Sequence, residues 1–146
     1  MQSLMITIKE DDPPYLFYVG ETFTVEWYYD EQGRMKAKEC YLEQLSEDEK
    51  DRLRSMVVYI ANSPHGTFLP KRLYNLEDAE NKIYAFKPKD YRFFNFMTAG
   101  KKIIIVDAYR KHSQKMGKKD LNLVRTAIKA REDYLDRIQR GTYYER

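Results

Sequence analysis

The fold of this chain is predicted most clearly by the stretch "DYRFFNFMTAGKKIIIVDAYRKHSQK", residues 90–115. Two runs rich in aromatic and aliphatic residues, "YRFFNFM" and "KKIIIVDAY", are typical of β-strands, and the small segment "TAG" separates them. We expect a hairpin here, with Gly100 taking the positive φ that a tight turn needs. Both runs carry cations that a purely structural strand does not need: Arg92 in the first, and Arg110, Lys111 and His112 at the end of the second.

The register of this hairpin decides which cations share a face of the sheet. A two-residue loop at Ala99 and Gly100 places Arg92 on the face of Tyr109 and Lys111. A three-residue loop, or one bulge, moves it to the face of Arg110 and His112. The sequence leaves both alternatives open.

Further strands are expected on either side of the hairpin. "KIYAFK" precedes it as a third strand of a meander, after a connector with a short apolar piece at residues 73–76. Near the start of the chain, "LFYV" and "FTVEWYY" predict two or three strands in residues 1–29. Residues 1–20 lie before the other predicted elements. We expect them to add a strand at the edge of the sheet rather than to contact a partner.

Three helices are predicted from apolar periodicity. The first places Ala37, Tyr41, Leu42 and Leu45 on one face. The second begins at Ser46, where "SEDE" forms a capping box, and ends near residues 61–66. Its buried stripe is formed by Leu53, Met56, Val57 and Ile60. The third runs from about Leu121, with one side formed by Val124, Ile128, Arg131, Leu135 and Ile138.

This order of elements predicts a single α+β domain over residues 1–146. A mostly antiparallel twisted sheet carries a helical pair and a C-terminal helix on one face, which leaves the other face free for a ligand. Trp27 and Cys40 are expected to be buried, and the acids at residues 47–49 to stabilise a helix N-terminus.

Charge is distributed unevenly along the chain. The net charge is +3, but residues 1–78 hold 9 Lys and Arg against 15 Asp and Glu, whereas residues 79–146 hold 17 against 8. A basic half is typical of a polyanion partner, although solvated helix faces account for it equally well. The single cysteine, the absence of a signal-like start and the absence of a long apolar run favour an intracellular, cytoplasmic protein with no membrane role.

Most familiar catalytic motifs are absent from the sequence. There is no glycine-rich phosphate loop and no nucleophile elbow, and two histidines with one cysteine do not make a zinc site. What remains is a set of cations interleaved with aromatic residues on the meander, which suits single-stranded RNA, with an ordinary solvated sheet as the alternative. The members of this set are Lys82, Lys87, Lys89, Arg92, Arg110, Lys111, His112, Tyr84, Tyr91, Phe93, Phe94 and Tyr109.

Four segments, taken in order, resemble the RelE/HigB superfamily of toxins, closest to its phage-derived HigB-like branch. They are residues 23–66, "KRLYNLEDAENKIYAFK", "YRFFNF" and residues 108–135, so the resemblance covers about residues 22–135. It implies a RelE/ParE-like fold and the toxin of a type II toxin–antitoxin pair. Such a toxin is an mRNA interferase, an endoribonuclease that cuts mRNA in the ribosomal A site and needs no cofactor or metal. Its partner would be a helix-turn-helix antitoxin, and a homo-oligomer stays open.

The resemblance also assigns residues. Arg92 and Arg110 match the family's strand arginines, and a guanidinium fork is suited to a phosphate that gains charge during cleavage. His112 and Lys111 are the candidate acid and base, since the chain has Met116 where relatives carry a tyrosine and Ile83 and Ala85 where some carry lysines. An exposed contact with a phosphate is the equal alternative for His112. RNA contacts are expected from Lys87, Lys89, Tyr91, Tyr109 and Lys115. Two other functions stay open, a ParE-like inhibitor of a topoisomerase and an RNA-binding homologue that does not cleave.

Overall fold

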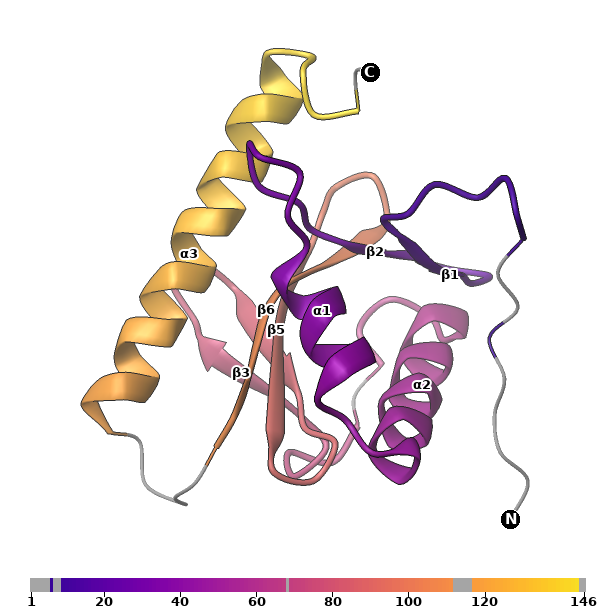
Figure 1. The fold of residues 1–146 in the computed structure, drawn as a ribbon, viewed down its shortest axis with the longest axis vertical. Helices are drawn as coiled ribbons and strands as arrows, with labels where there is room; N and C mark the ends of the chain where they lie inside the picture. The colour runs from indigo at the N-terminus through magenta and orange to yellow at the C-terminus, as the bar shows by residue number, and fades with distance from the viewer. Residues whose placement is uncertain (1–5, 7–8, 68, 112–116, 145–146) are drawn as a thin grey trace.

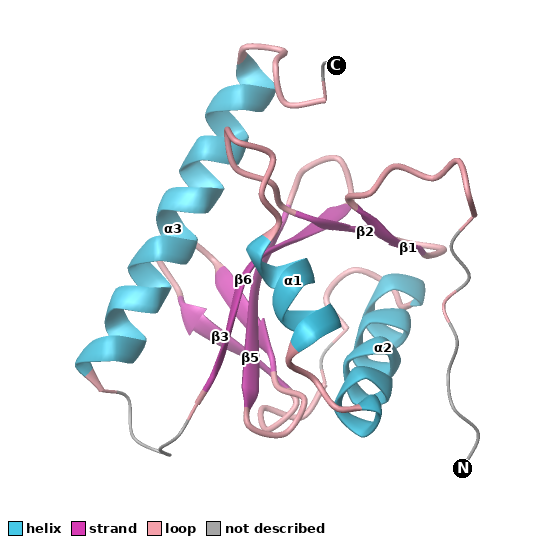
Figure 2. Cartoon of the chain, viewed as in Figure 1, coloured by secondary structure: helices cyan, strands magenta, loops and turns pink. Residues whose placement is uncertain are grey.

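The computed structural model describes residues 6, 9–67, 69–111 and 117–144, and within them the chain forms a six-stranded mixed sheet and three helices (Figures 1 and 2). The strands are β1 (Leu16–Val19), β2 (Thr24–Trp27), β3 (Tyr74–Asp78), β4 (Ile83–Phe86), β5 (Tyr91–Met97) and β6 (Lys102–Arg110). The helices are α1 (Lys36–Glu43), α2 (Glu47–Asn62) and α3 (Lys118–Gln139). The α+β class predicted from the sequence is confirmed.

The sheet has the strand order β1-β2-β6-β5-β4-β3, and only the β2–β6 pair is parallel among the described residues. β1 therefore forms one edge, as expected for an extra strand before the core. The other edge is β3, which the sequence suggested only as a short apolar connector. Its five residues alternate weakly in polarity, so its pairing with β4 rather than its own pattern makes it a strand.

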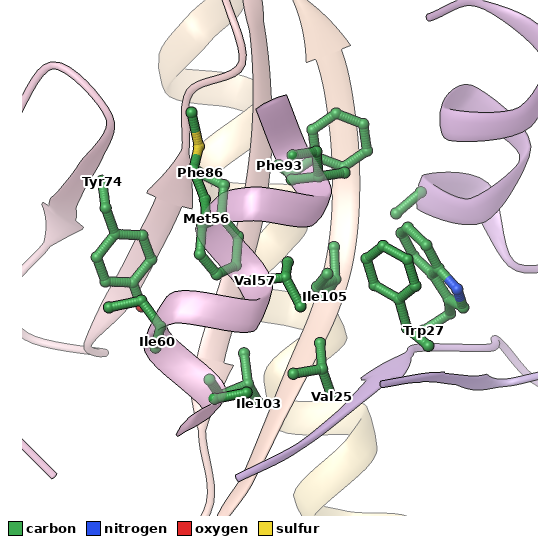
Figure 3. Packing of buried hydrophobic residues seen from close by; sticks show 14 of the residues in the cluster. Val25, Trp27, Met56, Val57, Ile60, Tyr74, Phe86, Phe93, Ile103 and Ile105 are labelled. Atoms are coloured by element: carbon green, nitrogen blue, oxygen red, sulfur yellow. The ribbon is translucent and has the colours of Figure 1, made fainter. Parts of the chain in front are cut away.

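Helices cover both faces of the sheet, so the prediction of a free face was wrong. Residues of β5 and β6 alternate between two separate cores. Phe93, Ile103 and Ile105 pack with α1 and α2, and Met56, Val57 and Ile60 of α2 lie over the strands (Figure 3). Trp27 belongs to the same core. The opposite core packs against α3 and contains Ile83, Ala85, Phe94, Phe96, Ile104, Val124, Ala127 and Tyr134.

The capping box at the start of α2 is formed as predicted. The Ser46 hydroxyl accepts from the Glu49 N–H at 3.2 Å, and Glu49 Oε1 accepts from the Ser46 N–H at 2.8 Å. The predicted stripe of α2 is buried throughout. Two other helical faces differ from the prediction, since Leu42 is exposed on α1, and Leu135 and Ile138 are exposed on α3.

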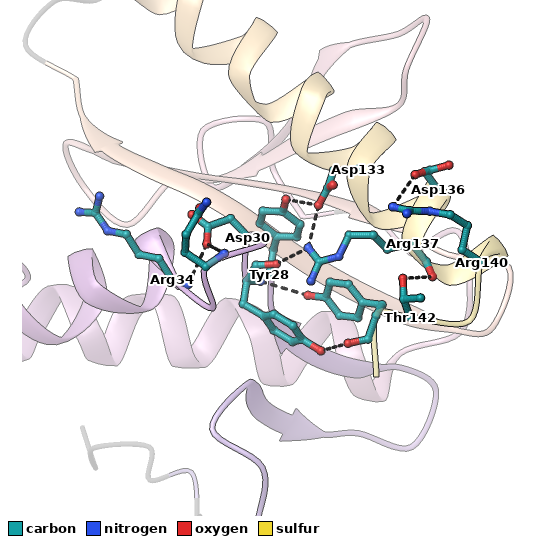
Figure 4. A network of polar contacts seen from close by, with 11 residues as sticks. Tyr28, Asp30, Arg34, Asp133, Asp136, Arg137, Arg140 and Thr142 are labelled. Atoms are coloured by element: carbon teal, nitrogen blue, oxygen red, sulfur yellow. Dashed lines mark hydrogen bonds and ion pairs between the residues drawn. The ribbon is translucent and has the colours of Figure 1, made fainter. Parts of the chain in front are cut away.

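Helix α3 buries a face rotated from the one predicted. Its buried residues are Val124, Ala127, Tyr134 and Arg137, and it begins three residues before Leu121. Arg137 is buried because its guanidinium donates to the Tyr29 carbonyl at 2.9 Å and to Asp133 at 2.8 Å (Figure 4). A cation thus occupies a core position that hydrophobic periodicity assigns to an apolar residue.

The chain after α3 folds back onto the sheet. Tyr143 is buried, its hydroxyl accepts from the Tyr29 N–H at 3.0 Å, and the centroids of the Tyr143 and Tyr29 rings lie 4.2 Å apart. Tyr144 donates to Glu26 at 2.6 Å. Across the part of the chain that the structure describes, no helix combines the length and apolar content that a bilayer crossing requires.

Candidate functional site

The β5–β6 hairpin combines a three-residue loop with a bulge. Thr98 and Lys102 close the loop, with the Thr98 N–H donating to the Lys102 carbonyl at 2.8 Å. The positive φ falls on Lys101, at 59°, and not on Gly100 as predicted, because a three-residue loop places its left-handed residue last.

The bulge lies at Val106 and adds a second one-residue shift to that of the loop. The two shifts together return Arg92 to the face that it would have with a two-residue loop and no bulge. Phe94 pairs with Asp107, whereas the next residue, Asn95, pairs with Ile105. The longer loop shifts the pairing by one residue and the bulge shifts it by one more. Arg92 consequently lies directly opposite Tyr109, on the face covered by α3, and alternation along the strand places Lys111 on that face too.

Arg92 and Tyr109 belong to a group of charged and aromatic side chains at the N-terminal end of α3. We call it the basic cluster, and it consists of Glu77, Lys87, Arg92, Tyr109, Lys111 and Asp120. Lys87 lies 3.6 Å from Glu77, and their side chains are only 16% and 12% exposed. Lys111 extends the β5–β6 pairing by one bond beyond β6, with its N–H donating to the Asp90 carbonyl at 2.6 Å.

Arg92 is the cation of this cluster with the simplest surroundings. Its Nη1 donates to the backbone carbonyls of Lys89 and Tyr91, at 3.0 and 2.9 Å. No carboxylate of the described residues lies within ion-pair distance of its guanidinium. The two carbonyls orient the guanidinium without neutralising it, which leaves its positive charge available to an anion.

Tyr109 is held in place by two contacts. Its ring stacks on Phe94 with 5.6 Å between centroids, and its hydroxyl donates to Asp120. Burial raises the pKa of this phenol, and the hydrogen bond to Asp120 raises it further. Tyr109 is therefore a neutral phenol near neutral pH and is poorly suited to act as a general base.

Asp120 links the cluster to the start of α3. Its Oδ2 accepts from the Gly117 N–H at 2.8 Å, which satisfies a donor at the helix start. This hydrogen bond has the largest effect and lowers the pKa of the Asp120 carboxyl. Burial raises that pKa by less, and the hydrogen bond from Tyr109 lowers it further. Asp120 was not predicted as a site residue, and its only signal in the sequence was an acid directly before the start of a predicted helix.

Lys87 is the member of the cluster whose pKa moves toward neutrality. Burial lowers the pKa of its ammonium, and the nearby Arg92 and Lys111 cations lower it further, while Glu77 opposes them. A lysine so perturbed exchanges protons more readily near neutral pH than an exposed one. Glu77 was also missed by the sequence analysis, because β3 was not recognised as a strand.

The remaining predicted site residues are placed elsewhere. Arg110 pairs with Tyr91 on the opposite face of the sheet from Arg92, where it lies 3.8 Å from Asp90 and is largely exposed. Lys89 forms an ion pair with Asp48 at 2.7 Å, at the start of α2. Tyr91 is 7% exposed and packs in the core beneath α1 and α2, so it offers no ring for stacking on a base. His112 and Lys115 lie outside the described residues.

No protein-family model matches this chain, and no curated protein matches it in sequence.

Proposed function

We propose that this chain is an endoribonuclease of the RelE/HigB type, the toxin of a type II toxin–antitoxin pair, and that it cleaves mRNA in the ribosomal A site at the basic cluster. The observation that carries the proposal is the placement of Arg92 opposite Tyr109, with the Lys87 and Lys111 cations beside them. Cations close to an aromatic ring suit an RNA backbone with an unstacked base.

The cluster has groups suited to each step of RNA cleavage. A base takes the proton of a 2′-hydroxyl, whose oxygen attacks the adjacent phosphorus while the bond to the 5′-oxygen breaks and that oxygen takes up a proton. The products are a 2′,3′-cyclic phosphate and a free 5′-hydroxyl. Arg92 is assigned to the phosphate oxygens, whose negative charge increases on attack, and Lys87 or Lys111 to proton transfer.

Tyr109 and Asp120 are positioning residues in this scheme. The phenol, held by Asp120 and Phe94, limits where a base can lie next to Arg92. The positive end of the α3 dipole lies on the same side and favours the approach of a polyanion. A helix-turn-helix antitoxin would be the partner that neutralises this surface.

A non-cleaving RNA-binding homologue is the second candidate, favoured by one observation. Arg92 and Arg110 lie on opposite faces of the sheet, so they do not clamp one phosphate between them. A cluster with a single oriented arginine holds RNA even where it does not accelerate cleavage.

The test is cleavage of a defined mRNA on purified ribosomes with an empty A site, with products identified by primer extension and end-group analysis. Arg92→Ala is expected to lower the cleavage rate by about a hundredfold or more, in line with the loss of one group that stabilises transition-state charge. Arg110→Ala is the matched control, since it removes an exposed arginine from the neighbouring strand on the other face. Its rate is expected to stay within about threefold of the unmodified chain.

Three outcomes separate the alternatives. Equal losses in Arg92→Ala and Arg110→Ala would contradict the assigned site. Tight RNA binding with no cleavage by the unmodified chain would favour the non-cleaving homologue. Growth arrest with intact mRNA and accumulated DNA breaks would favour a topoisomerase inhibitor.

A further inference from the structure

A pocket of about 210 Å³ lies between the connector after β2, the bulge of β6 and the middle of α3. It is lined by Tyr28, Asp30, Arg34, Lys36, Val106, Asp107, Thr126, Lys129 and Ala130. None of these residues belongs to the basic cluster. Figure 4 shows Asp30 and Arg34 in the connector, on the side of Tyr28 away from Arg137.

Asp107 reaches this pocket because of the β6 bulge. Ile105 and Ala108 pack on the side of α1 and α2, whereas Val106 packs in the core under α3 and Asp107 lines the pocket beside it. Two consecutive residues therefore face α3, which regular alternation forbids. The bulge thus places a carboxylate on a face that is otherwise apolar.

One oxygen of this carboxylate is available to a ligand. Asp107 is 9% exposed, and its Oδ1 accepts from the Ala108 N–H at 2.8 Å. Within the described residues its Oδ2 forms no hydrogen bond. Every fully buried side-chain oxygen and nitrogen among those residues has a partner, so Oδ2 is not fully buried. Oδ2 is therefore accessible through the pocket, where it can accept a hydrogen bond from a bound molecule.

Two cations at the rim form no ion pair, whereas Asp30 and Arg34 have polar partners. Asp30 Oδ1 accepts from the N–H groups of Gln32 and Arg34, both at 2.9 Å, and Arg34 Nε lies 3.0 Å from Glu39. Lys36, at the start of α1, and Lys129, on α3, are exposed and form no ion pair with any described residue. The two lysines at the rim therefore favour an anionic group, whereas the carboxylate of Asp107 requires a hydrogen-bond donor.

The size of the pocket limits the ligand. Its volume of about 210 Å³ is below the roughly 300–1,000 Å³ of pockets for drug-sized molecules, which favours a small ligand. Val106, Ala130 and the ring of Tyr28 supply an apolar wall for a short carbon chain.

We propose that this pocket binds a small hydroxy or amino acid. The ligand's anionic group faces Lys36 and Lys129 at the rim, its hydroxyl or amino group donates to Oδ2 of Asp107, and its short carbon chain lies against Val106 and Ala130. This is a binding site separate from the proposed RNA-cleavage site.

Three probes of similar size test each part of this arrangement. Glycerate carries an anionic group and hydroxyl donors, propionate lacks the donors, and glycerol lacks the charge. Each is titrated to 20 mM into the ¹⁵N-labelled full chain, and amide shifts are followed at Val106, Ala108, Thr126 and Ala130. Glycerate is expected to give saturable shifts there, with propionate and glycerol each binding at least tenfold more weakly.

Two variants assign the contacts. Asp107→Asn replaces Oδ2 with an amide that donates, so it is expected to weaken glycerate at least fivefold and to leave propionate unchanged. Lys129→Gln, at an exposed position that does not endanger folding, is expected to weaken both anions at least threefold. Lys118→Gln, on the first turn of α3 and outside the pocket, is the control and is expected to change neither.

Two results overturn the proposal. One is the absence of saturable shifts at the pocket amides with glycerate up to 20 mM. The other is a glycerate affinity that is the same in the unmodified chain, Asp107→Asn and Lys129→Gln. Because these readouts involve no RNA, they are independent of whether the chain cleaves mRNA.

Discussion

Arg92 lies directly opposite Tyr109 across the β5–β6 pair, and this relationship exists only because a three-residue loop and a bulge both occur in one hairpin. Either irregularity alone would place Arg92 on the same face as Arg110. Together they bring Arg92 to the N-terminal end of α3, where Lys87, Lys111 and Asp120 also lie.

Tyr109→Phe keeps the ring on Phe94 but removes the hydrogen bond to Asp120. We expect a loss of about 1 kcal/mol in the free energy of unfolding, because the bond is charge-assisted but lies near solvent. Urea unfolding measures this loss. The pH dependence of RNA cleavage is expected to keep its midpoints, since the raised pKa of the phenol prevents it from titrating in that range. A displaced midpoint in Tyr109→Phe would assign Tyr109 a proton-transfer role.

Arg137→Ala removes a buried cation and leaves Asp133 without its guanidinium partner. We expect a loss on the order of 3 kcal/mol in the free energy of unfolding, since breaking a buried ion pair leaves an uncompensated charge. Arg140→Ala is the matched control, because its ion pair with Asp136 at 2.9 Å is exposed and contributes about 0–1 kcal/mol. Thermal and urea unfolding of both variants measure this difference in the free energy of unfolding. Equal losses would show that the buried ion pair stabilises the fold no more than the exposed one.

Cys40 is expected to resist alkylation in the folded protein. Burial raises the pKa of its thiol to about 11 from an ordinary 9.0, so the thiolate is about a hundredfold scarcer at pH 8 than for an unperturbed thiol. Iodoacetamide labelling followed by mass spectrometry should be at least a hundredfold slower without denaturant than in 6 M guanidinium. Similar rates in the two conditions would place Cys40 at the surface.

Asp107→Asn is expected to stabilise the protein at neutral pH. Burial raises the pKa of the Asp107 carboxyl in the folded state, with the Ala108 N–H and the Lys36 and Arg34 cations acting against it. A raised pKa means that the folded state binds the proton more tightly, so stability decreases as pH rises through the two pKa values. The advantage of Asn should therefore be largest above the folded pKa and disappear as pH falls toward the ordinary value of 3.8. Urea midpoints measured from pH 3.5 to 7.5 check this, and an advantage independent of pH would refute the charge as its cause.

Local features of the chain were predictable because their causes are local. The capping box of α2 depends on residues three apart, and its buried stripe follows helical geometry, so Ser46, Leu53 and Ile60 are placed as expected. The strands of the hairpin were also recognisable from their composition. The cations of the candidate site were identifiable for the same reason, since Lys87, Arg92 and Lys111 flank or occupy these strands.

Most of the helices and strands, and the α+β class, were predictable from the sequence alone, whereas long-range packing sets which side chains meet. The pattern of polar and apolar residues along a strand does not reveal a bulge. Only the pairing with β5 shows that Val106 shifts the register and turns Asp107 toward α3. The sequence left open whether Arg110 shares a face with Arg92, and the three-residue loop together with the bulge places it on the opposite face. Helix α3 covers the second face of the sheet with Val124, Ala127 and Tyr134. It also buries Arg137 through hydrogen bonds, an arrangement that hydrophobic periodicity does not detect. The cause is common to these cases: long-range pairing sets the register and the burial of polar groups, and neither leaves a periodic signal in the chain.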